Sequence, residues 1–196
     1  MTRGTLFTLA FCLLLAASPG TAETAESPPA LTAQEITQLT LDDLFAKLPE
    51  HAGSPPGRRI EAEILKRFHR SGSDTADLLL TWANSAIESK NYPLALDVLD
   101  QIVVIRPDFA EAWNKRATVH FLMDEYGASI ADIRQTLALE PRHFGALAGL
   151  GMIFQTIERK EDAIRVFKRA LEINPQLDSV RESLDRLKLE TAGDSI

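Results

Sequence analysis

The sequence predicts an all-α fold built from stacked antiparallel helix pairs. Pro107, Pro141 and Pro175 follow one another at intervals of 34 residues, and each comes directly after a similar apolar run. Because proline cannot continue a helix, each of them marks the end of the second helix of a pair. Composition agrees: aromatic residues are only 7% of the chain, while Ala and Leu recur throughout, which favours helices over a sheet sandwich.

Three units can be aligned on these prolines, at 76–109, 110–143 and 144–177. In each unit a large residue recurs close to very small ones. The fourth position holds Leu79, Trp113 and Leu147, the eighth holds Ala83, Ala117 and Gly151, and the twentieth holds Ala95, Ser129 and Ala163. Two antiparallel helices need small residues where their backbones approach and bulky neighbours beside them. The pattern therefore predicts helix pairs over 75–106, 109–140 and 143–174.

The period and these residues together resemble the tetratricopeptide repeat (TPR) family, over about half of the chain. The resemblance rests on Trp113, Ala117, Tyr126, Ser129, Pro141, Leu147, Leu150, Gly151, Ala163, Phe167, Ala170 and Pro175. It implies a right-handed helical solenoid that binds proteins. Trp82 and Arg116 stand where the family usually has Leu, and Lys160 where it usually has Tyr. The alternative is an unrelated helical bundle, in which the spacing and the small residues would agree only by chance.

The segment before the three units predicts one more helix pair, over 40–71, with its loop at 51–57. Thr40 is a plausible N-cap with Asp43 three residues later, and Gly and Pro mark the loop. Pro49 occupies a place where the complete units have Ala or Gly. We therefore expect 40–73 to be a degenerate N-terminal pair that caps the array.

The segment after Pro175 predicts a C-terminal capping helix over 178–190, followed by a frayed tail at 191–196. Apolar residues recur there at steps of three or four, and charged residues fill the positions between them. One apolar face and one charged face are what a terminal helix of a solenoid needs to cover the last unit and meet water.

The first 22 residues have the features of a secretory signal peptide. These features are Arg3, the uncharged run 5–17, the helix-breaking Pro19 and the small residues Gly20 and Ala22. As a helix, the uncharged run would rise only about 20 Å, which is short of the ~30 Å hydrocarbon core of a bilayer. We therefore expect cleavage after Ala22, no stable membrane insertion afterwards, and a periplasmic or secreted protein.

The polar residues that follow, 23–39, are expected to form a flexible spacer. Cys12 is the only cysteine, so the processed chain would have no disulfide and no thiolate metal site. Lipid modification of Cys12 is the alternative to cleavage after Ala22. Phe11 before it, and the apolar run continuing after it, argue against that alternative.

Catalysis, metals, cofactors and nucleic acids are all disfavoured by the sequence. The four histidines are never closer than 18 residues, and no phosphate-binding loop, dinucleotide motif or nucleophile motif occurs. Gly149 and Gly151 fall in the middle of a predicted helix, where we expect them to allow close helix packing. The formal net charge of −7 provides no basic field for phosphates. We expect a protein that is not an enzyme and holds no cofactor or metal.

Function is therefore expected on the inner wall of the arc that stacked helix pairs form. In the family's register, positions 2, 5, 9 and 12 of each unit face inward. The predicted partner-binding face consists of Leu80, Asn84, Ile87, Glu111, Asn114, Thr118, Phe121, Ala148, Met152 and Gln155. Amides there would pair with the backbone of an extended peptide, and the apolar residues would hold its side chains. The alternative is that Ile87 and Phe121 pack on neighbouring helices while the polar residues are merely solvated.

Family members that grip the C-terminal carboxylate of heat-shock chaperones carry basic residues on their first and third units. Here Leu80 replaces the first-unit Lys, and Gly145 and Gly149 replace the third-unit bases, so that clamp is absent. His143 is expected to be an exposed turn residue, with a partner contact as the alternative.

The sequence thus predicts a non-enzymatic interaction module of the bacterial envelope that binds a peptide or protein segment on its concave face. This expectation draws on a weaker resemblance to exported bacterial repeat proteins of unassigned role. The alternative is an accessory subunit of an envelope enzyme or assembly machine that docks through its outer face or through residues 142–144.

Overall fold

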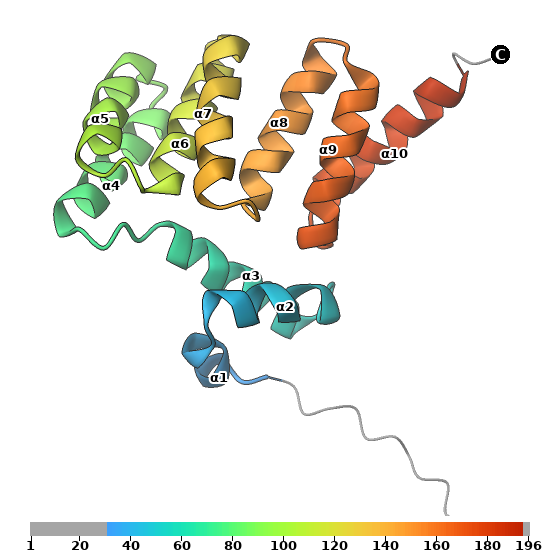
Figure 1. The fold of residues 1–196 in the computed structure, drawn as a ribbon, viewed down its shortest axis with the longest axis horizontal. Coiled ribbons are helices and arrows are strands. Elements are labelled where there is room, and N and C mark those ends of the chain that lie inside the picture. Colours follow the sequence, from blue (N-terminus) through green and yellow to red (C-terminus); the bar gives the residue numbers. More distant parts are fainter. Residues whose placement is uncertain (1–30, 194–196) are drawn as a thin grey trace, which may run out of the picture.

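The computed structural model describes residues 31–193, and helices make up nearly all of this range (Figure 1). Within it there are ten helices and no strand, so the predicted all-α fold is confirmed. The predicted signal peptide, the first part of the expected spacer and residues 194–196 of the expected tail lie outside the described residues.

Six helices form three antiparallel pairs that stand side by side, and a seventh closes the row (Figure 1). The pairs are α4 (Asp74–Glu88) with α5 (Tyr92–Ile105), α6 (Ala110–Leu122) with α7 (Tyr126–Leu139), and α8 (Phe144–Thr156) with α9 (Lys160–Ile173). The closing helix is α10 (Asp178–Gly193). It buries Val180, Leu184 and Leu187 in the core that it shares with α9, as the apolar face of the predicted capping helix requires.

The small residues bring the two helices of a pair into contact, as the sequence pattern predicts. In the second pair, the Ser129 hydroxyl donates a 2.7 Å hydrogen bond to the carbonyl of Ala117. In the third pair, the Phe167 ring fills the space beside Gly151, where an added Cβ would lie 2.3 Å from a ring carbon. In both pairs the close contact is made at the eighth position of the unit, against the twentieth position in the second pair and the twenty-fourth in the third.

The same turn joins the two helices of every pair. Lys90, Asp124 and Glu158 occupy equivalent positions and all adopt the left-handed conformation, with φ of 58° to 60°. In each turn the following amide donates a 2.8 Å hydrogen bond to a carbonyl near the end of the first helix. This is the geometry of a left-handed helix C-terminus, and its repetition shows that the three pairs share one backbone design.

The N-terminal segment forms three helices: α1 (Ala33–Gln38), α2 (Leu41–Glu50) and α3 (Pro55–Phe68). Helix α1 falls within the range that we expected to be a flexible spacer, so that expectation is wrong for residues 33–38. Thr32 and Glu35 form a capping box that starts the helix, and Ile36 is buried in the core. Helix α2 continues through Pro49, which lies in its last turn.

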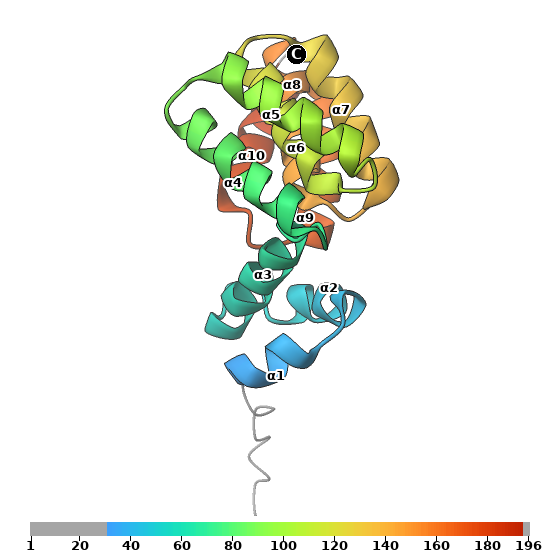
Figure 2. The same ribbon diagram turned by 90° about the vertical axis from the view of Figure 1, so that its left-hand side faces the viewer.

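These three helices do not stack on α4 and α5, so the predicted N-terminal cap is a second correction. Two views at right angles show α1–α3 beneath the row of pairs (Figures 1 and 2). Their buried apolar residues share one core with α8, α9 and α10, whereas α4 and α5 have a separate core. The chain changes direction at Gly72 (φ 75°), and two hydrogen bonds from Ser71 to the Asp77 carboxylate fix this turn.

Gly151→Ala is expected to destabilise the protein, although alanine favours helices over glycine. The new Cβ would overlap the Phe167 ring, and such overpacking costs about 1–3 kcal/mol. Gly149→Ala on the same helix is the control, because its Cβ would lie 3.9 Å from Ile133, an ordinary contact. That control should gain up to about 1 kcal/mol from helix propensity. Urea unfolding measures both changes, and effects of the same sign would contradict the packing argument.

Candidate functional site

The inner wall of the array carries an apolar hollow of about 340 Å³ between α6 and α8. We call it the α6–α8 pocket. Five residues of the predicted partner-binding face line it: Asn114, Thr118, Phe121, Ala148 and Met152. Other parts of the lining were not predicted from the sequence, among them Leu122 and Ile133. Gly149, which was expected to allow close helix packing, stands at the pocket wall.

A second hollow, also of about 340 Å³, lies between α8 and α10. It shares Met152 with the α6–α8 pocket and is lined as well by Gln155 and Arg186. The predicted residues Asn84 and Ile87 lie on α4, and both are partly exposed. The inner wall therefore presents two neighbouring hollows on α6, α8 and α10, and partly exposed side chains on α4.

Two residues of the predicted face are not on the surface. Leu80 is only 2% exposed because it packs in the core formed by α4, α5 and the start of α6. Glu111 is only 4% exposed, and its carboxylate binds His69 at the end of α3 and His143 at the start of α8. Neither side chain can contact a partner in this arrangement.

Glu111 is the centre of a buried polar cluster that joins α3, α6 and α8. Its carboxylate lies 3.0 Å from His143 Nε2 and 3.4 Å from His69 Nε2, and Asn114 donates to it at 3.1 Å. The Ala146 amide donates to His143 Nδ1 at 3.1 Å, so the ring proton is on Nε2 and is donated to Glu111. The cluster therefore satisfies its buried polar atoms internally.

His143 is buried, which corrects the expectation of an exposed turn residue. Its side chain is 2% exposed, and the Phe68 ring at the end of α3 stacks on it with 4.5 Å between ring centres. It also caps the N-terminus of α8 through the Ala146 amide. The residue thus positions α8, one wall of the α6–α8 pocket, and is not available to a partner.

The pKa of the Glu111 carboxyl is lowered from its ordinary value. Burial by itself would raise this pKa, but the hydrogen bond from His143 and the positive charge of Lys115 at 3.5 Å act in the opposite direction and outweigh it. The carboxylate therefore stays ionised while buried, and the hydrogen bond between α6 and α8 is maintained.

Further polar contacts hold the N-terminal helices to the loops between the pairs. Arg142 Nη1 lies 2.7 Å from the Asp42 carboxylate, and its guanidinium stacks on the Phe45 ring at 4.3 Å. Asn174 donates to Glu61 at 2.7 Å. Residues 142–144, one of the two predicted docking surfaces for a larger assembly, are largely covered by these contacts.

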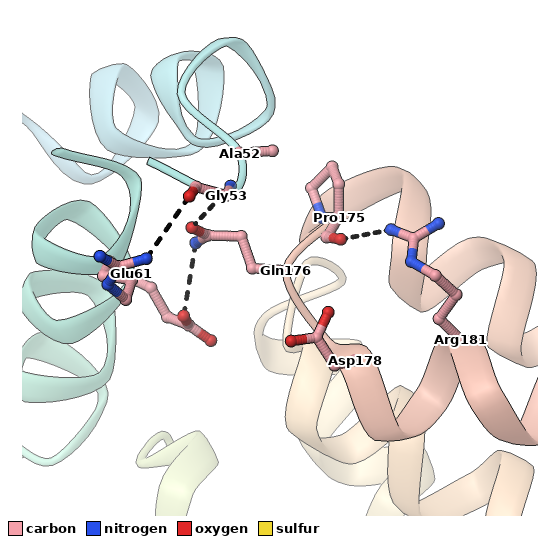
Figure 3. Close-up of a pocket in the computed structure, with 8 residues that line it drawn as sticks. Ala52, Gly53, Glu61, Pro175, Gln176, Asp178 and Arg181 are labelled. Atoms are coloured by element: carbon pink, nitrogen blue, oxygen red, sulfur yellow. Dashed lines mark hydrogen bonds between the residues drawn. The ribbon is translucent and has the colours of Figure 1, made fainter. Parts of the chain in front are cut away.

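The start of α10 meets the loop between α2 and α3 at a polar seam of about 420 Å³ (Figure 3). Gln176 bridges it, accepting from the Gly53 amide at 3.2 Å and donating to Glu61 at 3.3 Å. Arg58 and Arg181 balance Glu61 and Asp178 in the lining. Among residues 31–193 no cluster of His, Cys, Asp or Glu could hold a metal ion, and no helix there could span a bilayer.

Among the helices of residues 31–193, none covers one face of the first pair, which we call the end face and define by Leu78 and Trp82 on α4. These side chains are 51% and 55% exposed. They stand at the third and seventh positions of their unit. The equivalent residues that follow are Ala112 and Arg116, Ala146 and Leu150, and Val180 and Leu184. All of these are buried or largely covered, because a preceding second helix lies against them.

Comparison with known proteins agrees with this architecture. The profile of the tetratricopeptide repeat family matches residues 123–178. A TPR repeat-containing protein of Rhizobium etli is 36% identical over 188 residues, covering 94% of this chain and 92% of the relative. These matches extend the resemblance from the repeat units to nearly the whole chain.

Two solved structures share the fold at low sequence identity. The first TPR of Spaghetti (RPAP3) bound to the HSP90 peptide SRMEEVD is 20% identical, with a TM-score of 0.57, over 60% of this chain and 93% of that one. The Yersinia enterocolitica type III secretion chaperone SycD, in complex with a peptide of the translocator YopD, is 16% identical, with a TM-score of 0.58, over 61% and 96%.

The Glu111 cluster predicts a loss of stability in acid. Because the pKa of the Glu111 carboxyl is lower in the folded chain than in the unfolded chain, the folded chain binds fewer protons. The stabilisation from this group is complete above the unfolded glutamate pKa of about 4.3, and it is lost as the pH falls through the lower pKa of the folded chain. Glu111→Gln should be less stable at pH 7 and should lack this part of the acid dependence. The exposed Glu172→Gln is the control. Chemical unfolding between pH 7 and pH 3 measures it, and parallel curves for Glu111→Gln and the wild type would refute it.

Proposed function

This chain belongs to the tetratricopeptide repeat family, and on that premise we propose that it is a non-enzymatic interaction module that binds a peptide or protein segment on its concave face. The observation that carries the proposal is the α6–α8 pocket, an apolar hollow on the inner wall that five residues predicted from the repeat register help to line. Relatives of the same fold are solved with peptides, an HSP90 peptide in one and a translocator peptide in the other.

The proposed mode of binding differs from that of the family members that bind the C-terminal carboxylate of heat-shock chaperones. Leu80, which stands in place of the first-unit base, is buried. Gly145 and Gly149 stand in place of the third-unit bases, and both line the pocket. The groove therefore offers apolar contact at the place where the clamp offers positive charge.

A catalytic role has little support in the arrangement of the described residues. The buried pair of Glu111 and His143 is the kind of pair that serves enzymes as a general base. Here both ring nitrogens are engaged in hydrogen bonds that hold α8 in place, and Phe68 covers the ring. The pair of Glu111 and His143 thus holds α6 and α8 together.

We propose that the protein acts in the bacterial envelope. The charge, apolar length and small residues of the first 22 residues support export with cleavage after Ala22. The relative from Rhizobium etli supports a bacterial setting. After cleavage, the polar residues that follow would lead into the capped start of α1 at Thr32.

A second candidate function is that of an accessory subunit in a larger envelope assembly. The end face favours it, because Leu78 and Trp82 occupy positions that a neighbouring helix covers in every later unit. Such a partner would extend the row of helices and leave the concave face free. Residues 142–144 no longer serve this candidate, since the N-terminal helices cover them.

Asn114→Ala combined with Phe121→Ala should reduce capture of the partner by about tenfold or more, because both side chains line the pocket. Cross-linking in the intact envelope, followed by mass spectrometry, identifies and quantifies the captured protein. Gln135→Ala with Leu139→Ala on α7 is the matched control, because both of these residues are exposed. Undiminished capture by the groove variant would refute concave binding. Cross-links concentrated at Lys90, in the turn between α4 and α5 of the first pair, would favour the second candidate.

Export predicts a mature protein that begins at Glu23. Expression of the full-length gene in a Gram-negative host should yield, in the osmotic-shock fraction, a chain that lacks residues 1–22. N-terminal sequencing and intact mass measure the cut. Replacing the apolar Leu13 and Leu14 by Asp should retain the full-length chain inside the cell, since an apolar run is what the export machinery requires. A full-length chain in the exported fraction would contradict the prediction.

A further inference from the structure

The lining of the α6–α8 pocket contains no ionisable side chain. Its polar side chains are already engaged within the protein. The Thr118 hydroxyl donates to the backbone carbonyl of Asn114 at 3.0 Å, and the Ser129 hydroxyl donates to the backbone carbonyl of Ala117. The side-chain nitrogen of Asn114 donates to the Glu111 carboxylate. A charged group placed here would lose its water without gaining a partner, and that is strongly unfavourable.

Asn114 is the exception at the pocket, because its amide group also has a carbonyl oxygen. The bond to Glu111 orients the amide and uses the nitrogen, which leaves Oδ1 to accept a hydrogen bond. The matching ligand thus combines an apolar body with one N–H donor beside it. An extended chain has this combination at every residue, since each side chain adjoins a backbone amide.

Glycines hold the pocket open. Added Cβ atoms at Gly145 and Gly149 would meet neighbours only at 3.4 Å or more, so core packing does not require glycine at either position. Gly151 on the same helix is different, since the Phe167 ring occupies the space beside it. A Cβ at Gly149 would face Ile133 across the pocket, whereas one at Gly145 would face the His143 ring, so Gly149 is the position at which a side chain would fill the pocket.

We propose that the α6–α8 pocket is a specificity pocket that accepts one large uncharged apolar side chain, such as that of Leu or Phe, from an extended segment of a partner protein. This inference rests on the proposed function and names the residue class that the groove selects. The size agrees: an apolar cavity of about 150 Å³ holds a benzene ring. The pocket, at about 340 Å³, therefore has room for such a side chain and part of its backbone.

The α8–α10 hollow adjoins the pocket at Met152 but carries Arg186 on its lining. A residue next to the apolar anchor would therefore meet a more polar surface. The selection for an uncharged apolar side chain applies to the α6–α8 pocket alone.

The test uses the purified protein and a set of short peptides made of Gly and Ser that differ only in a central Leu, Phe, Asp or Lys. Amide NMR shifts measured during titration give the site and the affinity. The Leu and Phe peptides should shift the amide signals of Gly149 and Ile153 and bind about tenfold or more tightly than the Asp and Lys peptides. Equal affinity for all four, or no shift at Gly149 with millimolar Leu peptide, would overturn the proposal.

Variants of the wall glycine complete the test. Gly149→Leu should fill the pocket and weaken binding of the Leu peptide by about tenfold or more. Gly149→Ala should weaken binding of the Leu peptide by a smaller factor and raise the melting temperature by about 2–4 °C, so that peptide affinity falls while stability rises. Gly127→Leu and Gly127→Ala are the matched controls, because a Cβ at Gly127 on α7 meets nothing within 4 Å.

Unchanged binding by both Gly149 variants would overturn the inference even if one of them folds poorly. The proposed function and the proposed apolar specificity of the pocket can fail separately. If an envelope partner is still lost on combining Asn114→Ala with Phe121→Ala, concave binding stands and only the assignment of an apolar anchor falls. If that double variant captures its partner normally, the proposed function itself is wrong.

Discussion

Each helix pair is held together where small residues let two backbones approach. In the third pair the Phe167 ring occupies the volume that a Cβ of Gly151 would need, and in the second a hydroxyl of one helix bonds a carbonyl of the other. The short separation fixes which side of each first helix faces its partner. The remaining side forms the inner wall, so the position of the α6–α8 pocket follows from packing on the opposite side of the same helices.

The N-terminal helices give this protein a feature that the repeat alone does not supply. They lie under the loops between the pairs and bind them through Arg142, His143, Asn174 and Gln176. The attached part of the row runs from the second unit to α10, which is the part that contains both hollows. Buried polar groups that are satisfied in this way fix one geometry, because leaving any of them unpaired would be unfavourable. The first unit has its own core and keeps its end face free.

Contacts that recur in every unit could be predicted from the sequence, whereas contacts that occur once could not. A period of 34 residues predicts the three pairs because each unit repeats the same local packing problem. Arg116, which stands where the family has Leu, keeps its place through ion pairs with Asp132 and Asp100 at 2.7 Å. From the sequence, Glu111 was predicted on the inner face and His143 in an exposed turn, because the repeat describes the array alone. Phe68 at the end of α3 stacks on His143, and His69 after it binds Glu111, both from more than 40 positions earlier. The hydrogen bond between Arg142 and Asp42, which are 100 residues apart, could not be predicted from the 34-residue period either.

The glycines of α8 separate folding from function most clearly. Glycine inside a helix is about 0.5–1 kcal/mol less favourable than alanine, so each one needs a reason. Gly151 has a packing reason in Phe167, but Gly145 and Gly149 have room for a Cβ. Positions where local preference is violated without a gain in packing are typical of functional sites. Here the violated preference lies at the wall of an uncharged pocket, in which Asn114 Oδ1 remains to accept a hydrogen bond from a ligand. On the proposed role of the pocket, the stability that α8 forgoes at Gly149 is offset by the space that this residue leaves for a partner's side chain.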